Sequence, residues 1–517
     1  MQNLPKLPIG VQHFSVLKGE NYLYIDKTEA VHQLANEGGA FFLSRPRRFG
    51  KSLFLHTLAE LAHGRRELFN DTWIEDKWDW SRKYPVLHFQ FASMSFHDMG
   101  LRPAILVVLK KMCVEHDIIP KTDDVKSIFG QLLQEISAKK GKLVLLVDEY
   151  DKPIITYLES HKMPIAIENQ AIMKDFYGIL KDNGDCTHLT MITGVSKFAR
   201  VSLFSDLNHL QDLTLNNRFA TTFGYTQTEV EVYFEPYIAK YLAETPDFTR
   251  ERFLEKVKLW YNGYSWDSRT TVYNPFGLLN FFKTGQFQNF WFASGTPSFL
   301  QHLLLNKGQT NFENCMVSNT FLDQYDLENI QSASLLFQTG YLTIKDINPE
   351  DNTMTLDYPN LEVRESFYQF LITYLGQRET DSKITVRELN AAFRNNDLEE
   401  AYQILCEVFD ALPYDVYKAS NEALYHGLIH ILFKYMGISI QSEVHTKRGR
   451  LDAVIQTGTH VYIFEFKFNK SSEAAIQQLQ KRDYAAKFRH LDKQIVGIGL
   501  NFTEKDHALD EWIVLEL

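Results

Sequence analysis

The N-terminal part of the chain alternates short apolar runs with stretches of helical periodicity. Between residues 39 and 196, four runs are apolar at nearly every position and have the length of strands; they cover residues 40–44, 86–92, 143–147 and 189–193. Strands that are apolar on both faces and separated by helices are typical of a parallel sheet covered on both sides. The pattern therefore predicts an α/β domain with a parallel sheet in residues 1–225.

Two changes of pattern divide the rest of the chain. Residues 226–416 have a mostly helical pattern, many Tyr, Phe and Trp residues, and turn sequences such as Asn274-Pro275. Residues 417–517 read as a second α/β unit, which is large enough to fold alone. Its expected elements are, in chain order, a helix at 421–436, strands at 438–446, 451–456 and 461–468, a helix at 472–489 and a strand at 494–500.

Composition narrows the class of protein. A chain of 517 residues corresponds to roughly three domains, because domains average about 150 residues. Hydrophobic residues make up 44% and charged residues 23%, which is ordinary for a globular protein and excludes wholesale disorder. The net charge of −11 argues against a general polyanion binder, although it leaves room for a local basic site.

Targeting signals and cysteines point to the cytoplasm. The N-terminus lacks the basic and apolar regions of a signal peptide, and no apolar run approaches the roughly 20 residues that span a bilayer. The cysteines have none of the close spacings of zinc or redox motifs, so reduced core thiols are expected. They are Cys113, Cys186, Cys315 and Cys406. We expect a cytoplasmic protein without a membrane partner.

Residues 41–52, FFLSRPRRFGKS, read as a strand, a loop and the start of a helix. The ending Gly50-Lys51-Ser52 matches the phosphate loop G-x-x-x-x-G-K-[ST]. Gly50 allows a tight turn, Lys51 brings a positive charge to the terminal phosphates, and Ser52 can bind Mg²⁺. The helix that follows directs its positive dipole end at the same anion. Arg45 stands where the motif has its first glycine, so a plain basic loop before a helix is the alternative.

A second element, which is acidic, supports the prediction of a nucleotide site. The apolar run at 143–147 leads directly into Asp148 and Glu149. In a P-loop ATPase such a pair holds Mg²⁺ through water and polarises the attacking water, respectively. The alternative is a strand that ends in a solvated turn. At the end of the 189–193 run, Thr193 or Ser196 could sense the γ-phosphate, although a plain turn fits equally well.

The expected cofactors of this site are ATP and Mg²⁺. Glu149 is the expected catalytic residue, and Ser52 and Asp148 are the expected metal-binding residues. The expected nucleotide-binding residues are Arg47, Arg48, Phe49, Gly50, Lys51, Ser52 and Asp148.

The C-terminal unit carries three charged residues inside two apolar strands. Asp452 interrupts the first strand, and Glu465 and Lys467 interrupt the second on one face, because residues two apart share a face. Burying such charges without partners is costly. A cation held by Asp452 and Glu465, with Lys467 orienting or activating water, resolves the conflict. The alternative is an amphipathic hairpin with a solvated Glu-Lys pair.

Positive charge gathers around this hairpin. Between residues 441 and 490, nine Lys and Arg face five Asp and Glu, a local excess of 9 − 5 = +4. Lys447, Arg448 and Arg450 directly precede Asp452. A phosphate-attracting patch beside a metal site is typical of proteins that act on nucleic acids.

Further side chains could assist the same site. Glu422 lies on the helix before the hairpin and could add a carboxylate, although a surface position is equally compatible. Gln480 and Tyr484 are four apart on the following helix and could brace the site or touch the substrate backbone, and Gln478 is also available. The alternative for this helix is an ordinary half-buried amphipathic segment.

Taken with these motifs, the sequence resembles a family of bacterial proteins with an N-terminal AAA-ATPase-like domain and a C-terminal PD-(D/E)XK nuclease domain. In that family the form Arg-Pro-Arg-Arg-Phe-Gly-Lys-Ser is a variant of the phosphate loop, so Arg45 does not count against nucleotide binding. The resemblance implies ATP binding and a restriction-endonuclease-like C-terminal fold. It rests on residues 7–10, 24–28, 45–52, 146–153, 193–197, 204–210, 223–230 and 291–300 and on the Asp452, Glu465 and Lys467 hairpin.

Together these observations predict a P-loop ATPase domain (1–225), a mostly helical middle region (226–416) and a nuclease domain (417–517). The expected activity is ATP binding and hydrolysis coupled to Mg²⁺-dependent cleavage of DNA, with a homo-oligomer possible. The rival is a nucleotide-dependent switch whose nuclease-like module binds nucleic acid or protein without cleaving it.

Overall fold

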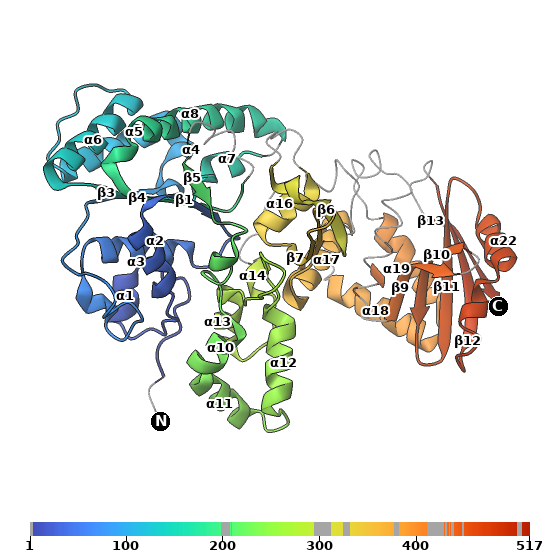
Figure 1. Ribbon diagram of the computed structural model, residues 1–517. Coiled ribbons are helices and arrows are strands. Elements are labelled where there is room, and N and C mark those ends of the chain that lie inside the picture. The colour runs from blue at the N-terminus through green and yellow to red at the C-terminus, as the bar shows by residue number, and fades with distance from the viewer. Residues whose placement is uncertain are drawn as a thin grey trace. The chain divides into compact units, whose positions relative to one another are not determined.

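The four apolar runs of the N-terminal part form one parallel sheet in the computed structural model (Figure 1). The strands are β1 (Gly39–Ser44), β2 (Val86–Gln90), β3 (Leu143–Asp148), β4 (Thr187–Gly194) and a short β5 (Leu210–Asp212). Their order is β2-β3-β4-β1-β5, and every pairing is parallel. Since β3 is buried at every position, its apolar sequence is explained by contacts on both faces.

Helices cover both faces of this sheet (Figure 1). One layer contains α1 (Phe14–Gly19), α2 (Thr28–Glu37) and α3 (Lys51–Ala62), and the other contains α5 (Leu101–Glu115), α6 (Val125–Lys140) and α8 (Met163–Asp182). Parallel strands end at the same edge of a sheet. The loop after β1 and the carboxylates after β3 therefore lie at one edge, separated only by β4.

The structure describes residues 4–158, 160–197, 207, 209–293, 312–323, 331–376, 382–410, 429, 432–433, 435, 439–446, 449–503 and 509–517. The chain forms two units: Met1–Gly295 with Glu313–Val363, and Thr296–Phe312 with Arg364–Leu517. The proposed boundaries at residues 225 and 416 remain predictions. No helix in the described ranges has both the length and the apolar character needed to cross a bilayer.

The middle region is largely helical, as the sequence predicts. Its helices in the first unit are α10 (Gln227–Tyr233), α11 (Glu235–Glu244), α12 (Arg250–Tyr261), α13 (Pro275–Thr284), α14 (Phe290–Ala293) and α16 (Ser332–Thr339). An apolar cluster joins α10–α13 to Leu23 and Ile25 of the N-terminal segment. The region also contains an antiparallel sheet that the sequence does not predict, formed by β6 (Cys315–Ser318), β8 (Thr353–Asp357) and β7 (Thr343–Asn348) in that order.

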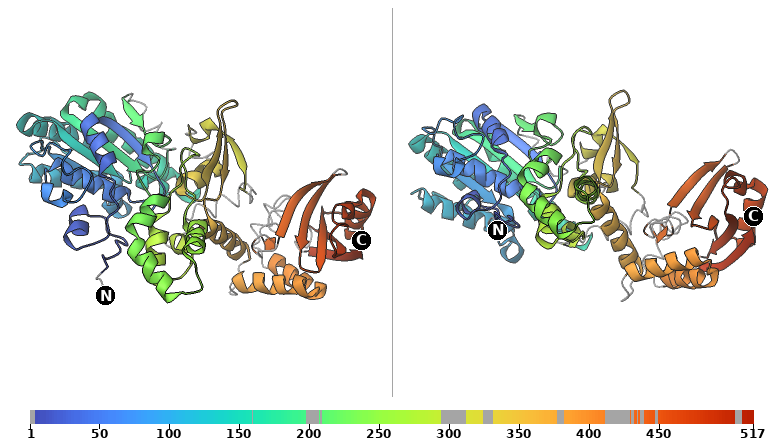
Figure 2. Two further views of the ribbon diagram at one scale, coloured as in Figure 1. Left: turned by 60° about the horizontal axis from the view of Figure 1, so that its bottom comes forward. Right: turned by 90° about the horizontal axis from the view of Figure 1, so that it is seen from below.

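The second unit combines helices with a five-stranded sheet (Figure 2). Its helices are α17 (Leu361–Gly376, of which the residues from Arg364 on belong to this unit), α18 (Ser382–Asn395), α19 (Leu398–Asp410) and α22 (Ser472–Arg482). The strands are β9 (Ser439–Thr446), β10 (Gly449–Gln456), β11 (His460–Phe468), β12 (Gln494–Phe502) and β13 (Leu509–Glu516), in the order β13-β12-β11-β10-β9. Only β11 and β12 are parallel.

Alternation along β11 fixes what lies on each face of this sheet. Val461 and Ile463 contribute to the apolar cluster with α22. Phe464 and Tyr462, on the opposite face, contact Phe393 of α18. The helix expected at 472–489 ends at Arg482, because Asp483 adopts a left-handed conformation with φ of 40°. The helix expected at 421–436 lies largely outside the described residues.

Candidate functional site

The loop after β1 turns sharply before α3. Gly50 precedes α3 with φ of 93°, in the left-handed region that favours glycine, and Arg48 also has a positive φ of 70°. A Cβ built on Gly50 would meet no atom within 4 Å, so the backbone there borders open space. An anion can therefore approach the loop and the N-terminus of α3 closely.

Lys51 points back over this loop. Its Nζ donates hydrogen bonds of 2.9 Å to the carbonyl oxygens of Arg45 and Pro46, and the residue is only 6% exposed. Burial lowers the pKa of the Lys51 ammonium, and the charges of Asp148 and Glu149 oppose that shift. The expected phosphate ligand and the expected metal carboxylates are therefore brought together. The side chains of Arg47 and Arg48 are exposed.

Asp148 ends β3 and is held in place by hydrogen bonds. Its Oδ1 accepts 2.9 Å hydrogen bonds from Thr193 Oγ1 and from the Glu149 backbone N–H. Glu149 itself has φ of 49°, which turns the chain sharply at the end of the strand. Burial raises the pKa of the Glu149 carboxyl, and Lys51 acts against that shift. A carboxyl with a raised pKa is better suited to accept a proton from water.

Ser196 and Asp151 form a different arrangement. Asp151 is 1% exposed, and its Oδ2 accepts hydrogen bonds from the backbone N–H groups of Val195 and Ser196 and from Ser196 Oγ. Burial raises the pKa of Asp151. Of the two residues considered for γ-phosphate sensing, Thr193 contacts Asp148, whereas the hydroxyl of Ser196 is used to hold its own loop.

Arg45, in the position of the missing glycine, does not line the phosphate loop. Its guanidinium is 1% exposed and donates to the carbonyl oxygens of Thr214 (2.9 Å) and Phe219 (3.1 Å). It also stacks on Trp266, with 4.0 Å between the guanidinium carbon and the ring centroid. Burial lowers its pKa to about 9. Arg45 thus has a structural role, which explains why the loop can carry an arginine in place of the first glycine of the motif.

A mainly apolar pocket adjoins the loop at Phe49 and Gly50. Its walls come from the N-terminal segment, α3 and residues 222–225. They include Pro8, Leu17, Tyr24, Leu53, Phe54, Phe223 and Tyr225. Pockets that bind flat, apolar ring systems have walls of this kind. The sequence gives no direct signal for this pocket, because its walls are far apart in the chain.

The C-terminal hairpin brings its three charged residues together. Asp452 Oδ2 accepts a 2.8 Å hydrogen bond from the Phe466 backbone N–H, so it lies beside β11. Glu465 is 2% exposed, and its Oε1 accepts from Lys467 Nζ at 2.9 Å. Burial, and secondarily the charge of Asp452, raise the pKa of Glu465 to about 7. The Oε2 atom of Glu465 has no hydrogen-bond partner among the described residues.

Gln478 is the α22 residue that reaches this site. Its Oε1 accepts from Lys467 Nζ at 3.1 Å, and its Nε2 donates to Glu465 Oε1. Gln480 is exposed, and Tyr484 is buried in the apolar cluster, with its hydroxyl accepting from Arg482. The hydrogen bonds described from α22 to Glu465 and Lys467 are those of Gln478. The sequence could not choose among these side chains, since the phase of α22 against the strands is a tertiary property.

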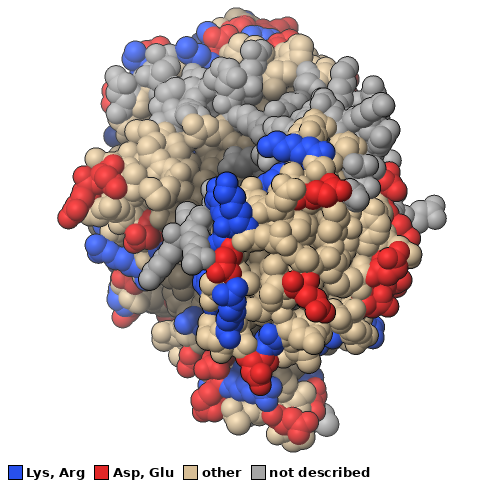
Figure 3. Space-filling view, turned by 90° about the vertical axis from the view of Figure 1, so that its right-hand side faces the viewer, with Lys and Arg blue, Asp and Glu red and all other residues tan. Residues whose placement is uncertain are grey.

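The residues expected on the approach to the hairpin are only partly described. Glu422, Lys447 and Arg448 lie outside the described residues, and of Arg450 only the backbone in β10 is described. Figure 3 looks onto the side of the molecule on which α22 lies. Lys and Arg side chains form a short row there, interspersed with Asp and Glu. The positive charge on this face is therefore interrupted by negative charge and does not form a continuous patch.

The donor set at the hairpin fits Mg²⁺ better than zinc. Among the described residues, no three or more His, Cys, Asp or Glu side chains are grouped as metal ligands. Structural zinc needs four such ligands, whereas Mg²⁺ takes one or two carboxylates and keeps several waters. Asp452 and Glu465 provide two carboxylates, and the buried Oε2 of Glu465 is an acceptor without a described donor.

These features define the class of protein: a P-loop nucleotide-binding fold in one unit and a restriction-endonuclease-like fold in the other. Comparison with known proteins agrees. Residues 8–204 match the family described as "Predicted AAA-ATPase", and residues 420–512 match the "PD-(D/E)XK nuclease superfamily". The chain belongs to the family that joins an AAA-ATPase-like domain to a C-terminal PD-(D/E)XK nuclease domain.

One full-length relative and one solved structure are also similar to this chain. The chain is 35% identical over 528 residues to an "Uncharacterized protein in vnfD 5'region" of Azotobacter chroococcum mcd 1, covering 99% of both chains. It is also similar to a signal transduction ATPase with numerous domains from Pyrococcus horikoshii, which carries a tetratricopeptide repeat sensor. That match has 10% identity, covers 80% of this chain and 58% of the other, and has a TM-score of 0.26.

Proposed function

We propose that the first unit binds and hydrolyses ATP. The observation that carries this proposal is the convergence of Lys51, Asp148 and Glu149 at one edge of the sheet, beside a loop with a left-handed Gly50. Lys51 and the loop amides would hold the phosphates, and Ser52 and Asp148 would hold Mg²⁺. Bound Mg²⁺ would neutralise charge on the phosphates. Glu149 would orient the attacking water and accept its proton.

The pocket beside Gly50 supports a nucleotide rather than a simple phosphate as ligand. It is mostly apolar and adjoins the loop that would carry the phosphates. The base would lie among Pro8, Tyr24 and Phe223, where stacking and burial of its faces favour binding.

We further propose that the C-terminal unit is a Mg²⁺-dependent nuclease acting on DNA. Asp452 and Glu465 would hold the metal, which lowers the pKa of bound water when present. Lys467, fixed by Glu465 and Gln478, would orient the attacking water or stabilise the charge on the phosphate. The buried Glu465 oxygen without a described donor is the single observation that favours metal binding over a purely structural ion pair.

The rival, a switch whose nuclease-like module only binds, is separated from this proposal by a cleavage assay. Full-length protein would be incubated with plasmid and single-stranded DNA, with and without Mg²⁺ or Mn²⁺. We expect metal-dependent cleavage that is lost in Lys467→Ala and in Asp452→Ala, while Lys467→Ala retains more metal affinity. Complete absence of cleavage in the wild type, with tight DNA binding, would favour the switch. Cleavage that persists in both variants would show that the hairpin is not its source.

A further inference from the structure

Each residue of the phosphate loop from 45 to 49 contacts the middle region of the same unit. Arg45 stacks on Trp266, and Phe49 packs edge-on against Tyr264 with 4.9 Å between ring centroids. Residues 46, 47 and 48 also contact this region, so every position from 45 to 49 lies against residues between 264 and 340. The unusual side chains of this loop therefore serve to dock it.

The contacts of the three central loop residues are equally close. Arg48 lies over Phe276, with 4.9 Å from the guanidinium carbon to the ring centroid. Pro46 packs against the backbone of Gly340, where a Cβ would lie 2.7 Å from the proline ring. The backbone carbonyl of Arg47 accepts a 3.2 Å hydrogen bond from Trp291 Nε1.

The bond from Trp291 controls the direction of a peptide group. In a trans peptide the C=O and N–H bonds point in opposite directions. With the Arg47 carbonyl fixed on Trp291, the N–H of Arg48 is directed to the opposite side of the loop. Arg48 also has φ of 70°, a conformation that non-glycine residues rarely adopt without outside support.

Trp291 is itself held in place by a buried carboxyl group. Glu362, at the start of α17, is fully buried, and its Oε1 accepts a 2.7 Å hydrogen bond from the Trp291 backbone N–H. Gly277 makes room for this carboxyl, because a Cβ there would lie 2.8 Å from Glu362 Oε2. On its other side the indole meets Gly340 and the ring of Tyr341.

We propose that Trp291 is a positioning residue of the nucleotide site. Its indole N–H holds the Arg47–Arg48 peptide so that the Arg48 amide faces the bound phosphates, and Glu362 holds Trp291 in that place. This inference rests on the proposed nucleotide site and adds a residue to it from outside the phosphate-loop motif.

The test compares affinities for ligands with and without phosphates. Trp291→Phe keeps an aromatic ring but removes the donor. Dissociation constants for ATP, ADP and adenosine would be measured for wild type, Trp291→Phe, Glu362→Gln, Glu362→Ala and the control Trp73→Phe. We expect Trp291→Phe to weaken ATP and ADP about fivefold, the worth of one ordinary hydrogen bond, and to leave adenosine unchanged. Glu362→Gln, which keeps an acceptor, should bind better than Glu362→Ala.

Each outcome decides between the claims. Unchanged ATP affinity in a folded Trp291→Phe protein overturns the positioning role while the nucleotide site stands. Equal weakening of adenosine also overturns it, because the effect would then be a general distortion. A wild-type protein that binds neither ATP nor ADP removes the proposed nucleotide site and this inference with it.

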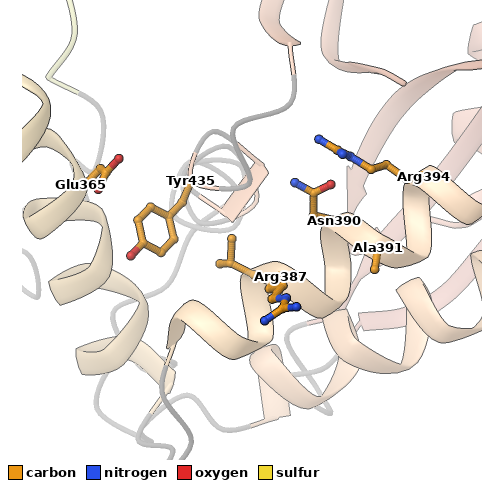
Figure 4. Close-up of a pocket in the computed structure, with 7 residues that line it drawn as sticks. Glu365, Arg387, Asn390, Ala391, Arg394 and Tyr435 are labelled. Carbon is orange, nitrogen blue, oxygen red and sulfur yellow. The ribbon is translucent and has the colours of Figure 1, made fainter. Parts of the chain in front are cut away.

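A separate observation concerns the second unit. A groove of about 590 Å³ is lined by Glu365 of α17, by Tyr435 and by Arg387, Asn390 and Arg394 of α18 (Figure 4). Both arginines are exposed, and neither forms an ion pair or hydrogen bond with the described part of the chain. Two exposed guanidinium groups against one carboxylate, Glu365, leave the groove with an excess of positive charge, which favours an anionic ligand.

The spacing of the two arginines suits a nucleic-acid strand. Seven residues along a helix correspond to about 10 Å, which is about three base steps of a strand at 3.4 Å per step. Asn390 lies between them on the same helix and also lines the groove. One residue before Arg394, Phe393 packs on Tyr462 and Phe464 of β11, the strand that also carries Glu465.

We infer that this groove binds the phosphate backbone of a nucleic-acid strand. This inference rests on the proposed nuclease function and names a substrate contact outside its hairpin. The full-length Lys467→Ala protein, which should not cleave, would be titrated with single-stranded and duplex DNA in EDTA by fluorescence anisotropy. The same background would carry Arg387→Ala with Arg394→Ala, or the control Lys487→Ala.

The salt dependence identifies the contact. Loss of two phosphate contacts should weaken binding and lower the slope of log K against log salt concentration by about 1.5, whereas the control should change neither. An unchanged slope and affinity overturn the inference even if wild-type cleavage is observed. Absence of DNA binding in the Lys467→Ala protein with its arginines intact also overturns it. Absence of cleavage by wild type, with the slope changed as expected, removes the nuclease proposal alone.

Discussion

Thr193 donates a 2.9 Å hydrogen bond to Oδ1 of Asp148, joining the ends of two adjacent strands. Both residues are buried, and the same oxygen also accepts the Glu149 backbone N–H. Because the bond fixes one carboxylate oxygen, it sets the direction of the other. The hydroxyl of Thr193 therefore links the end of β4 to the expected metal ligand on β3.

Replacement of Thr193 by Val should test this link, since Val has nearly the same shape and lacks the hydroxyl. A hydrogen bond to a charged group contributes about 1.5–3 kcal/mol, so we expect ATP hydrolysis to fall roughly tenfold or more. The Mg²⁺ concentration for half-maximal rate should rise. Thr193→Ser keeps the donor and is the matched control. Equal rates for Val and wild type would contradict the role.

Lys51→Ala should weaken ATP binding at least tenfold, or about 1.4 kcal/mol, because it removes the charge directed at the phosphates. Calorimetric titration of the full chain measures the effect. Lys139→Ala, at an exposed position of α6, is the control for loss of one positive charge. Since Lys51 also bonds to two loop carbonyls, the melting temperature of both variants should be recorded. Undiminished affinity in Lys51→Ala would exclude its contact with phosphate.

Glu149→Gln and Asp151→Asn should behave differently, although both replace a carboxylate by an amide. We expect Glu149→Gln to bind ATP and hydrolyse it about a hundredfold more slowly, as for loss of a general base. Asp151→Asn should instead destabilise the fold by about 1–3 kcal/mol, because its buried carboxylate accepts from Val195 and Ser196. Thermal unfolding and steady-state hydrolysis distinguish them. A fully stable Asp151→Asn protein without hydrolysis would make Asp151 the base.

Gln478→Ala should slow DNA cleavage roughly tenfold and raise the metal requirement, since Gln478 bonds to both Glu465 and Lys467. Losses of 10- to 100-fold are usual when a residue that orients metal ligands is removed. Gln480→Ala is the matched control, because Gln480 is exposed on the same helix. If both variants cleave at the same rate, Gln478 has no part in the reaction.

The buried Glu362 predicts a pH dependence of stability. Burial raises its pKa to about 8, above the value of 4.5 of an ordinary Glu. Between these values the unfolded chain binds fewer protons than the folded one, so this group's contribution to the free energy of unfolding falls as pH rises. Glu362→Gln does not titrate. From pH 5 to 8 the wild type should lose roughly 1–4 kcal/mol relative to the variant in denaturant unfolding. A constant difference would contradict the shift.

The sequence predicts the elements whose pattern is strong and local. Runs such as 143–147 are apolar at every position and become β3 and its neighbours, and the order of the motifs places the phosphate loop and Asp148 at one edge. The sheet of β6, β7 and β8 is not predictable in the same way. Its strand Thr343–Asn348 carries Lys345 and Asp346 on a half-exposed surface, so apolar periodicity is weak.

Contacts that depend on packing escape prediction from the sequence. Gln478 rather than Gln480 reaches the hairpin because of how α22 lies on β11. The sequence also shows Arg45 only as a missing glycine, while its partners lie about 170 to 220 residues further along the chain, at Thr214, Phe219 and Trp266. A local motif carries no record of such distant partners.

The contacts of Arg45 restrict which substitutions relatives of this protein can accept at this position. A glycine at position 45 would remove the guanidinium donor from the carbonyl oxygens of Thr214 and Phe219, of which the second keeps the Thr222 backbone N–H, and would leave Trp266 without the group stacked on it. The loop and the segment around Trp266 thus depend on each other, and a substitution in one requires a compensating substitution in the other. An alignment of homologues should show positions 45 and 266 changing together, and a chimera that receives a glycine-rich loop from another ATPase should fold only if the docking segment comes with it.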